Sequence, residues 1–262
     1  MNFIPILLAG ISICPINTVR VPNTNTCIDR YEWPNTKGTL PSIGMSAIVS
    51  NFDSKRGIVA DAERSCASVG KRVCQYDEWK TSCEGPKRSK YPFGPKLPRI
   101  QKADDAPCNY AEFFTAPDRT KIYYRDPHEF ARLDKRDPSG ERGCVSASGA
   151  EDMMGNVEEW VKCPPFMSLS KNNCTKNKNG SIKACYCLMG RYWAAPYSCD
   201  YAIAGHSPQW YDYQTGFRCC KTARKVPITS TISMREILRS EFSINDYVFP
   251  LLHLGRGHRI PY

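Results

Sequence analysis

The cysteines are the residues of this 262-residue chain best suited to chemistry, and there are fourteen of them. They are Cys14, Cys27, Cys66, Cys74, Cys83, Cys108, Cys144, Cys163, Cys174, Cys185, Cys187, Cys199, Cys219 and Cys220. An even number at scattered spacings predicts up to seven disulfides, formed in an oxidising compartment. Structural zinc is the less favoured alternative, because zinc modules repeat close pairs of thiols. Here the close pairs are Cys185 with Cys187 and Cys219 with Cys220, and neither spacing is the usual chelate.

A short acidic loop offers a second kind of chemistry. It reads Asp152-Met-Met-Gly-Asn-Val-Glu-Glu159. Ca²⁺ takes ~6–8 oxygen ligands and mixes carboxylates with backbone carbonyls on a tight turn. Asp152 and Glu159 can supply the carboxylates, and the carbonyl groups of Gly155 and Val157 can turn inward between them. The alternative is that both acids cap turns and face water.

Aromatic side chains with polar tips gather in one stretch of the chain. They are Tyr192, Trp193, Tyr197, Tyr201, His206, Trp210, Tyr211 and Tyr213, and Arg191 precedes them. Exposed aromatic rings are typical of recognition surfaces, because they bury much area at a low entropic cost. This stretch therefore predicts a surface for a protein or glycan ligand. The alternative is that several of these rings pack in the core, with His206 as a hydrogen-bonded structural residue.

Short strands, two helices and long loops must position these residues. The expected elements are a hairpin from Cys14 to Trp33, helices over 57–69 and 75–83, long loops over 84–149, and short strands at 184–189 and 216–220. In the first helix, Val59, Ala62, Cys66 and Val69 share one face. The expected fold class is α+β.

Composition and charge exclude several classes of protein. The chain has 36 Lys and Arg against 26 Asp and Glu, a net charge of +10, and 41% hydrophobic residues, which is near globular averages. The basic residues form no single stripe and match no nucleic-acid-binding motif, so no nucleic-acid partner is expected. No apolar run approaches the ~20 residues that span a bilayer, so no membrane span is expected.

Three segments are expected along the chain. Residues 1–13 are apolar and resemble a signal-peptide core or an anchoring segment, without a basic start or a clear cleavage site. Residues 14–223 hold all the cysteines and form the main domain. Residues 224–262 form a basic C-terminal extension, whose expected role is docking onto a larger assembly.

Four motifs occur in order along the main domain. They are Cys27-Ile-Asp-Arg-Tyr-Glu32, Gly70-Lys-Arg-Val-Cys-Gln-Tyr-Asp-Glu-Trp79, Met154-Gly-Asn-Val-Glu-Glu-Trp160 and Gly216-Phe-Arg-Cys-Cys220. Together they resemble the formylglycine-generating enzyme family, also called the sulfatase-modifying factor family. The resemblance covers residues 14–223 and implies a loop-rich, disulfide-stapled variant of the C-type-lectin fold.

The resemblance also implies a calcium site and some of the disulfides. The calcium site would lie at Asp152, Gly155, Val157 and Glu159, the four residues of the acidic loop described above. The expected bridges join Cys66 and Cys74 to Cys219 and Cys220 and, from proximity along the chain alone, Cys14 to Cys27 and Cys108 to Cys144.

The catalytic site implied by the resemblance is incomplete in this sequence. The family oxidises a substrate cysteine to formylglycine with copper held by two thiolates, and soft Cu(I) prefers such ligands. The second thiolate position is Cys199, but the first is Ala194, and the family's nearby serine is Arg191. Cys199 could instead bond to Cys83, whose usual partner position holds Ala204.

Two functions from different classes follow. The favoured one is a non-catalytic recognition or adhesion module that is secreted, in the periplasm or envelope, or on a virion surface. The alternative is a copper-dependent formylglycine-generating oxidase whose site has moved to other thiols, such as Cys185 and Cys187. A structural component of a larger assembly is a third.

Overall fold

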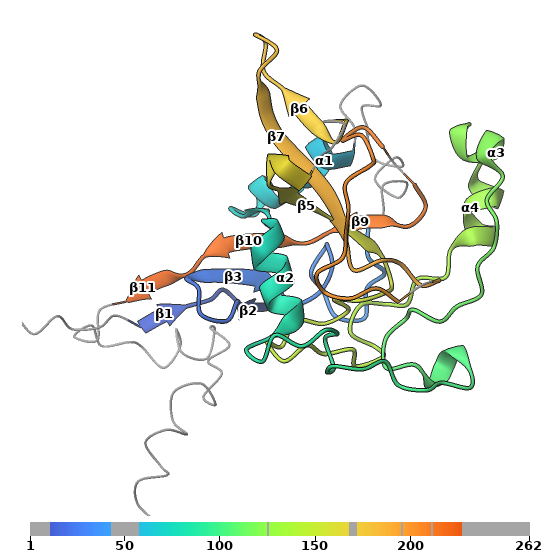
Figure 1. The fold of residues 1–262 in the computed structure, drawn as a ribbon, viewed down its shortest axis with the longest axis horizontal. Helices are drawn as coiled ribbons and strands as arrows, with labels where there is room; N and C mark the ends of the chain where they lie inside the picture. Colours follow the sequence, from blue (N-terminus) through green and yellow to red (C-terminus); the bar gives the residue numbers. More distant parts are fainter. Residues whose placement is uncertain are drawn as a thin grey trace, which may run out of the picture.

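Two small sheets lie at the centre of the molecule, with helices and long loops around them (Figure 1). The computed structural model describes residues 11–42, 58–124, 126–167, 172–194, 196–210 and 212–226. Tyr211 of the expected ligand surface lies outside these described residues, as do residues 1–10 and 227–262 of the expected terminal segments.

Four strands form the first sheet, in the order β2, β3, β10, β4. Their bounds are Thr18–Arg20, Thr26–Asp29, Cys219–Thr222 and Arg72–Val73. β2 and β3 make the expected hairpin. β10 comes from the other end of the domain and pairs antiparallel with both β3 and β4. This sheet therefore brings the first, second and fourth sequence motifs together.

Five strands form the second sheet, in the order β6, β7, β5, β9, with β8 paired to β7. Their bounds are Cys174–Lys176, Ile182–Met189, Glu158–Cys163, Thr215–Phe217 and Ala202–Ile203. The strand expected over 216–220 is thus two strands, β9 and β10, which belong to different sheets. Arg218 lies at the break between them, and its side chain is buried.

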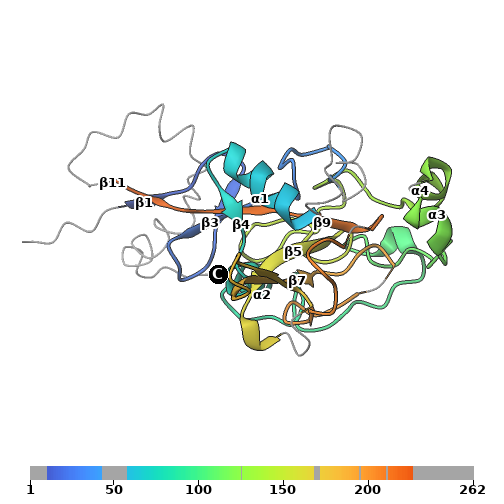
Figure 2. The ribbon, with the colours of Figure 1, turned by 90° about the horizontal axis from the view of Figure 1, so that it is seen from above.

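A two-stranded ribbon joins the two ends of the described chain. β1 (Ile11–Ile13) pairs antiparallel with β11 (Arg224–Val226). The ribbon extends at one end of the molecule, and two short helices, α3 and α4, lie at the opposite end (Figures 1 and 2). The expected terminal segments therefore meet through their described residues.

Two longer helices form at the expected places. α1 spans Ile58–Ser68 and buries the predicted apolar face of Val59, Ala62 and Cys66. Val69 was expected on the same face, but it follows the last helical residue and is 49% exposed. The helix ends there because Gly70 adopts a left-handed conformation with φ +67°.

α2 spans Tyr76–Glu84 and buries Trp79 and Cys83. The Glu78 carboxylate accepts the backbone N–H of Gln75 at 2.9 Å, which supports the start of the helix. Trp79 and Cys83 lie four residues apart and so share the buried face.

The region expected to be loop contains short helices. They are η2 (Ala103–Asp105), α3 (Arg119–Tyr123) and α4 (Pro127–Leu133), and η3 (Pro165–Met167) follows later. The Asp118 and Asp126 carboxylates cap α3 and α4 by accepting backbone N–H groups. Helices this short are not marked by a helical periodicity in the sequence. The capping aspartates Asp118 and Asp126 were the sequence features that could have indicated where α3 and α4 begin.

All fourteen cysteines are in disulfides. The pairs are Cys14–Cys27, Cys66–Cys219, Cys74–Cys220, Cys83–Cys199, Cys108–Cys144, Cys163–Cys187 and Cys174–Cys185. The first five are the pairings considered from the sequence, and the last two staple β5, β6 and β7. Each bridge typically contributes ~2–4 kcal/mol by restricting the unfolded chain. Bridges therefore support a fold in which much of the backbone is irregular.

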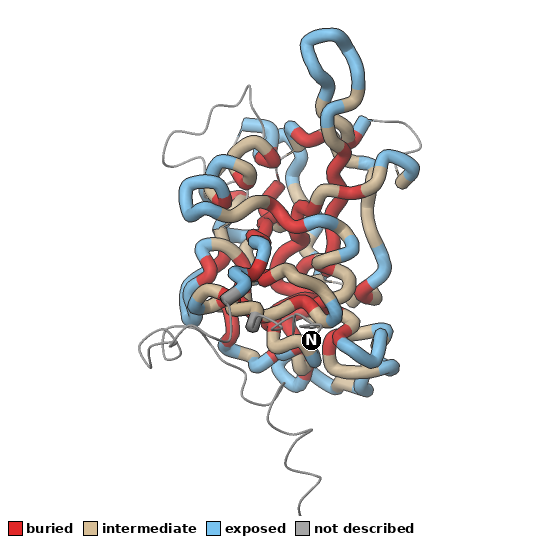
Figure 3. The backbone as a smooth tube through the Cα atoms, turned by 90° about the vertical axis from the view of Figure 1, so that its left-hand side faces the viewer, coloured by how far each residue is buried: buried red, intermediate tan, exposed pale blue. Residues whose placement is uncertain are grey.

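Buried residues run through the middle of the molecule, and the surrounding loops are exposed (Figure 3). The four motifs meet there around Arg218, which is 1% exposed, and the second motif takes part through Trp79, whose Nε1 donates to Glu159. Arg218 Nε and Nη2 donate to the two oxygens of Glu159, each at 2.6 Å. Nη1 and Nη2 also donate to the carbonyls of Asp29, Arg30 and Glu151. All five guanidinium N–H groups are thereby used.

Loss of this buried cation should strongly destabilise the protein. Arg218→Met leaves the Glu159 carboxylate buried without its partner, which typically costs about 3–5 kcal/mol. Arg72→Met is the matched control, because Arg72 pairs with Glu78 and its side chain is 38% exposed. That loss should be at most about 1 kcal/mol. Urea denaturation with the disulfides intact measures both, and equal losses would contradict the prediction.

Candidate functional site

The position of the family's copper-binding cysteines holds no thiol in this structure. Cys199, the expected catalytic residue, is bonded to Cys83 and is 1% exposed. The alternative pair of thiols is also unavailable, because Cys185 is bonded to Cys174 and Cys187 to Cys163. Cu(I) needs thiolate sulfur that is free to coordinate. The residues present therefore do not fit a copper site, and the assignment of Cys199 as catalytic is corrected to a structural disulfide.

The acidic loop is buried and tightly built. Gly155 has φ +82°, and a Cβ there would meet the Asn109 carbonyl oxygen at 2.0 Å, so the loop requires glycine at this position. The Val157 side chain is buried in an apolar cluster. Both oxygens of Glu159 are occupied, since Trp79 Nε1 also donates to Oε2 at 2.7 Å. Calcium would have to compete with Arg218 for this carboxylate.

Two further carboxylates lie near Glu159. Asp152 accepts the backbone N–H of Gly140 at 2.6 Å, and burial raises the pKa of its carboxyl to about 6. Glu32 accepts from Ser139 and Asn156, and its other oxygen has no hydrogen-bond partner. Burial, with the nearby Asp152 and Glu159, raises the pKa of Glu32 well above its usual range. No group of three or more His, Cys, Asp or Glu side chains arranged for a metal ion occurs within the described residues.

Three of the aromatic residues expected at the ligand surface are buried instead. Tyr192, Trp193 and Tyr213 are 5%, 2% and 3% exposed and pack on one another. Ile122 of α3 and Leu133 of α4 complete the same cluster. The expectation for these three residues is corrected, because their rings pack with residues of α3 and α4 in a buried cluster and are closed to a ligand.

The other described residues of that stretch remain accessible, and we call them the aromatic face. They are Arg191, Tyr197, Tyr201, His206 and Trp210. The rings of Tyr197 and Tyr201 have centroids 4.1 Å apart, and His206 stacks on Trp210 at 4.5 Å. Tyr201 is exposed, and the other four are half-buried. The face therefore offers two aromatic pairs beside one arginine.

Two buried carboxylates anchor arginines at this face. Arg191 Nη1 donates to Glu158 at 2.8 Å, and Arg119 Nη1 donates to Asp212 at 3.2 Å. Burial raises the pKa of both carboxyls, and the paired arginines oppose the rise. Burial lowers the pKa of His206, Arg119 and Arg191 lower it further, and Asp212 opposes them. These charges thus act on one another across a single site.

Sequence reasoning missed part of this site. Arg119 and Asp212 belong to it through their ion pair, but Arg119 lies in a region without periodicity and more than ninety residues from Asp212. No spacing signal joins them. Glu158 lies within the third motif, next to Glu159, and this position in the motif was the available pointer to it.

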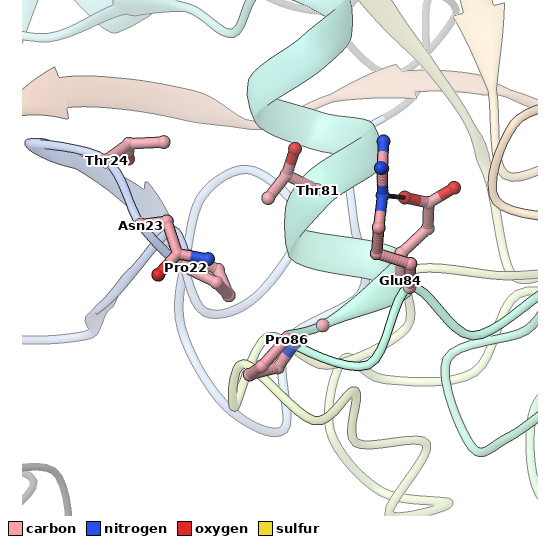
Figure 4. Close-up of a pocket in the computed structure, with 8 residues that line it drawn as sticks. Pro22, Asn23, Thr24, Thr81, Glu84 and Pro86 are labelled. Carbon is pink, nitrogen blue, oxygen red and sulfur yellow. Dashed lines mark ion pairs between the residues drawn. The ribbon is translucent and has the colours of Figure 1, made fainter.

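A separate pocket of about 330 Å³ lies between the β2–β3 turn and the end of α2 (Figure 4). It is lined by Pro22, Asn23, Thr24, Thr81, Glu84, Gly85, Pro86 and Arg88. Arg88 pairs with Glu84 across 4.0 Å. None of these lining residues is an expected site residue, and the pocket is separate from the aromatic face.

Comparison with known proteins supports the resemblance found in the sequence. The profile of the family described as sulfatase-modifying factor enzyme 1-like domain matches residues 58–223. The match contains the second, third and fourth motifs, and it confirms the expected family and fold. A comparison with curated protein sequences finds no match.

Solved structures with a similar fold share little sequence with this chain. The P3c variant of Major Tropism Determinant is 13% identical with a TM-score of 0.49, over 84% of this chain and 56% of that one. Treponema denticola variable protein 1 is 12% identical with a TM-score of 0.41, over 82% and 94% of the two chains. PvdO from Pseudomonas aeruginosa is 15% identical with a TM-score of 0.42, over 75% and 80%. This chain spans just over half the length of the Major Tropism Determinant chains.

The disulfides fit an oxidising compartment, as expected from the cysteine count. Within the described part of the chain, every helix is too short or too polar to cross a membrane.

Thiol counting tests the assignment of the cysteines. We expect no reactive thiol after unfolding without a reductant, because every cysteine is paired. After reduction, the same dye should count fourteen. Two reactive thiols in the unreduced protein, mapped to Cys199 or to the Cys185 and Cys187 pair, would contradict the assignment and return the oxidase as the leading alternative.

Calcium at Asp152, Gly155, Val157 and Glu159 stays a prediction. A ligand that binds only the folded state stabilises it by about 2.7 kcal/mol at one hundred times its Kd. Millimolar calcium should therefore raise the thermal midpoint relative to EGTA, and Asp152→Asn should reduce the rise. An identical midpoint with calcium and with EGTA would contradict the prediction.

Proposed function

We propose that this chain, which belongs to the family of sulfatase-modifying factor enzyme 1-like domains, is a non-catalytic recognition module. Its ligand is a protein or a glycan bound at the aromatic face. One observation carries the proposal. Cys199 matches a position at which the family binds copper, but here its sulfur is bonded to Cys83, and accessible aromatic residues lie beside it. The chain keeps the fold of the family but lacks the two free thiolates that would bind copper.

The chemistry of sulfur supports a non-catalytic role. Cys83 lies on α2, and its bond to Cys199 fixes the segment that leads into the aromatic face. Cys199 N–H also donates to the Lys90 carbonyl at 2.9 Å. A sulfur bonded to another sulfur cannot act as a thiolate ligand. Cys199 therefore holds the aromatic face in place.

The composition of the aromatic face supports recognition. Tyrosine, tryptophan and arginine are the residue types enriched where proteins bind partners. Tyr197 and Tyr201 present rings with polar tips, which bury area at a low entropic cost. Arg191 lies with its guanidinium carbon 4.8 Å from the Tyr197 ring centroid, so its orientation is fixed before a ligand arrives.

The proposal also includes the cellular location of the protein and a second interaction, made by its C-terminal extension. A secreted, periplasmic, envelope or virion-surface location gives the oxidising conditions that seven disulfides need. Residues 224–262 are proposed to dock onto a larger assembly, and residues 224–226 already pair with β1. Deletion of residues 227–262 should then weaken assembly and leave the aromatic face intact.

Substitution at the aromatic face should weaken recognition without unfolding the protein. The variant combines Tyr197→Ala and Trp210→Ala, which removes one ring from each aromatic pair. On arrays of defined glycans and peptides, ligands of the native protein should bind at least about tenfold more weakly, since buried aromatic anchors are worth ≥ ~2 kcal/mol.

The control for this test is Phe166→Ala, because Phe166 is 81% exposed and belongs to η3. It removes an exposed ring from another part of the surface and should leave binding unchanged. Circular dichroism and the thermal midpoint check that both variants fold. A native protein that binds nothing on either array, or whose binding survives the double substitution, would contradict the proposed function.

A further inference from the structure

Arg119 is exposed and Arg191 is partly exposed, but the carboxylates that anchor them are buried. The Arg119 side chain is 63% exposed and that of Arg191 is 24% exposed. Their partners Asp212 and Glu158 are 2% and 1% exposed. A ligand therefore meets the guanidinium groups first, while the negative charges lie beneath them. Each ion pair has no net charge, but the part of it at the surface is the guanidinium group, which donates hydrogen bonds.

Part of the Arg191 guanidinium can reach a ligand. Nη1 donates to Glu158 and Nε is buried, so the 24% of the side chain that is exposed is the part open to a ligand. The guanidinium carbon lies 5.1 Å from the ring centroid of Tyr192 and 4.8 Å from that of Tyr197. Held between two rings, the planar group presents a fixed edge, which suits binding of a carboxylate or sulfate group.

Aromatic rings lie near these charges. The planes of Tyr197 and Tyr201 are tilted by 49°, so each ring presents its own face, and His206 stacks on Trp210 with an angle of 29° between the planes. His206 lies within electrostatic reach of both Arg119 and Arg191, which places the second pair among the same charges. Flat rings with polar edges suit the apolar faces and hydroxyl groups of sugar rings.

We propose that the aromatic face binds an acidic glycan, a sugar chain that carries carboxylate or sulfate groups. The acidic groups bind Arg119 and Arg191, and the sugar rings stack on the two aromatic pairs. This inference rests on the proposed function and names its ligand class. An acidic peptide would meet the same arginines, but it offers no row of flat rings to the aromatic pairs.

The test uses pairs of probes with the same sugar backbone, of which one member carries acidic groups and the other is neutral. Oligogalacturonate is compared with its methyl ester, and dextran sulfate with dextran, by calorimetry on the full chain. Polyglutamate of equal charge represents an acidic peptide. At least one acidic sugar should bind about tenfold more tightly than its neutral counterpart, since a charge-assisted contact is worth that much. The two pairs of probes separate carboxylate from sulfate as the preferred group, and affinity should fall as salt is added.

Variants then assign the effect to the two arginines. Arg119→Gln removes one exposed cation, and Arg191→Gln combined with Glu158→Gln removes the second ion pair without leaving a buried charge unpaired. Each should weaken acidic-sugar binding about five- to tenfold and leave the neutral sugar unchanged. Arg72→Gln, in the other sheet, lowers the net charge by one, as Arg119→Gln does, and should have no effect.

Three results would overturn the inference. The first is equal affinity for acidic and neutral sugars, and the second is polyglutamate binding as tight as that of the best acidic sugar. In both cases, loss of binding in the Tyr197→Ala, Trp210→Ala variant would still support the proposed function. The third is no binding of any sugar, and if the arrays are also empty, the proposed function fails with it.

Discussion

The buried contact between Arg218 and Glu159 is the constraint on which the rest of the fold depends. A guanidinium without access to water must find a partner for each N–H group. Arg218 finds them on β3, on the acidic loop and on β5, and Trp79 of α2 completes the Glu159 carboxylate. Four motifs that are far apart in the sequence are therefore near one another in space. Displacing any of them would leave a charge or a polar group unpaired.

Disulfides decide what the inherited scaffold can do. A cysteine can hold a soft metal or hold two segments together, but a single sulfur cannot do both. At Cys199 the bond to Cys83 fixes the segment that carries Tyr197 and Tyr201 of the aromatic face. Other bridges join elements of the core, with Cys66–Cys219 between α1 and β10 and Cys163–Cys187 between β5 and β7. The disulfides therefore hold the helices and both sheets together.

Electrostatics at the aromatic face follow from which partner of each ion pair is buried. Glu158 and Asp212 lie beneath the surface, and Arg191 and Arg119 lie above them. Because each buried carboxylate is paired with an arginine, it holds the guanidinium group in one orientation. It also repels an anion at the surface less than an exposed, unpaired carboxylate would. Tyr192, Trp193 and Tyr213 pack under the same region and hold it in shape.

The sequence by itself determined the family, the α+β class and the two longer helices, because these depend on local periodicity and on motifs such as Gly216-Phe-Arg218. It offered candidate bridges but left their connectivity open, and the structure pairs Cys66 with Cys219 and Cys74 with Cys220. The sequence could not separate Tyr197 from Tyr192, since both are tyrosines in one aromatic stretch. Only the tertiary structure decided that Tyr192 is buried, that Cys199 is bonded, and that Arg119 joins Asp212. The reason is that burial and long-range pairing depend on which distant segments pack together, and short-range spacing does not record this.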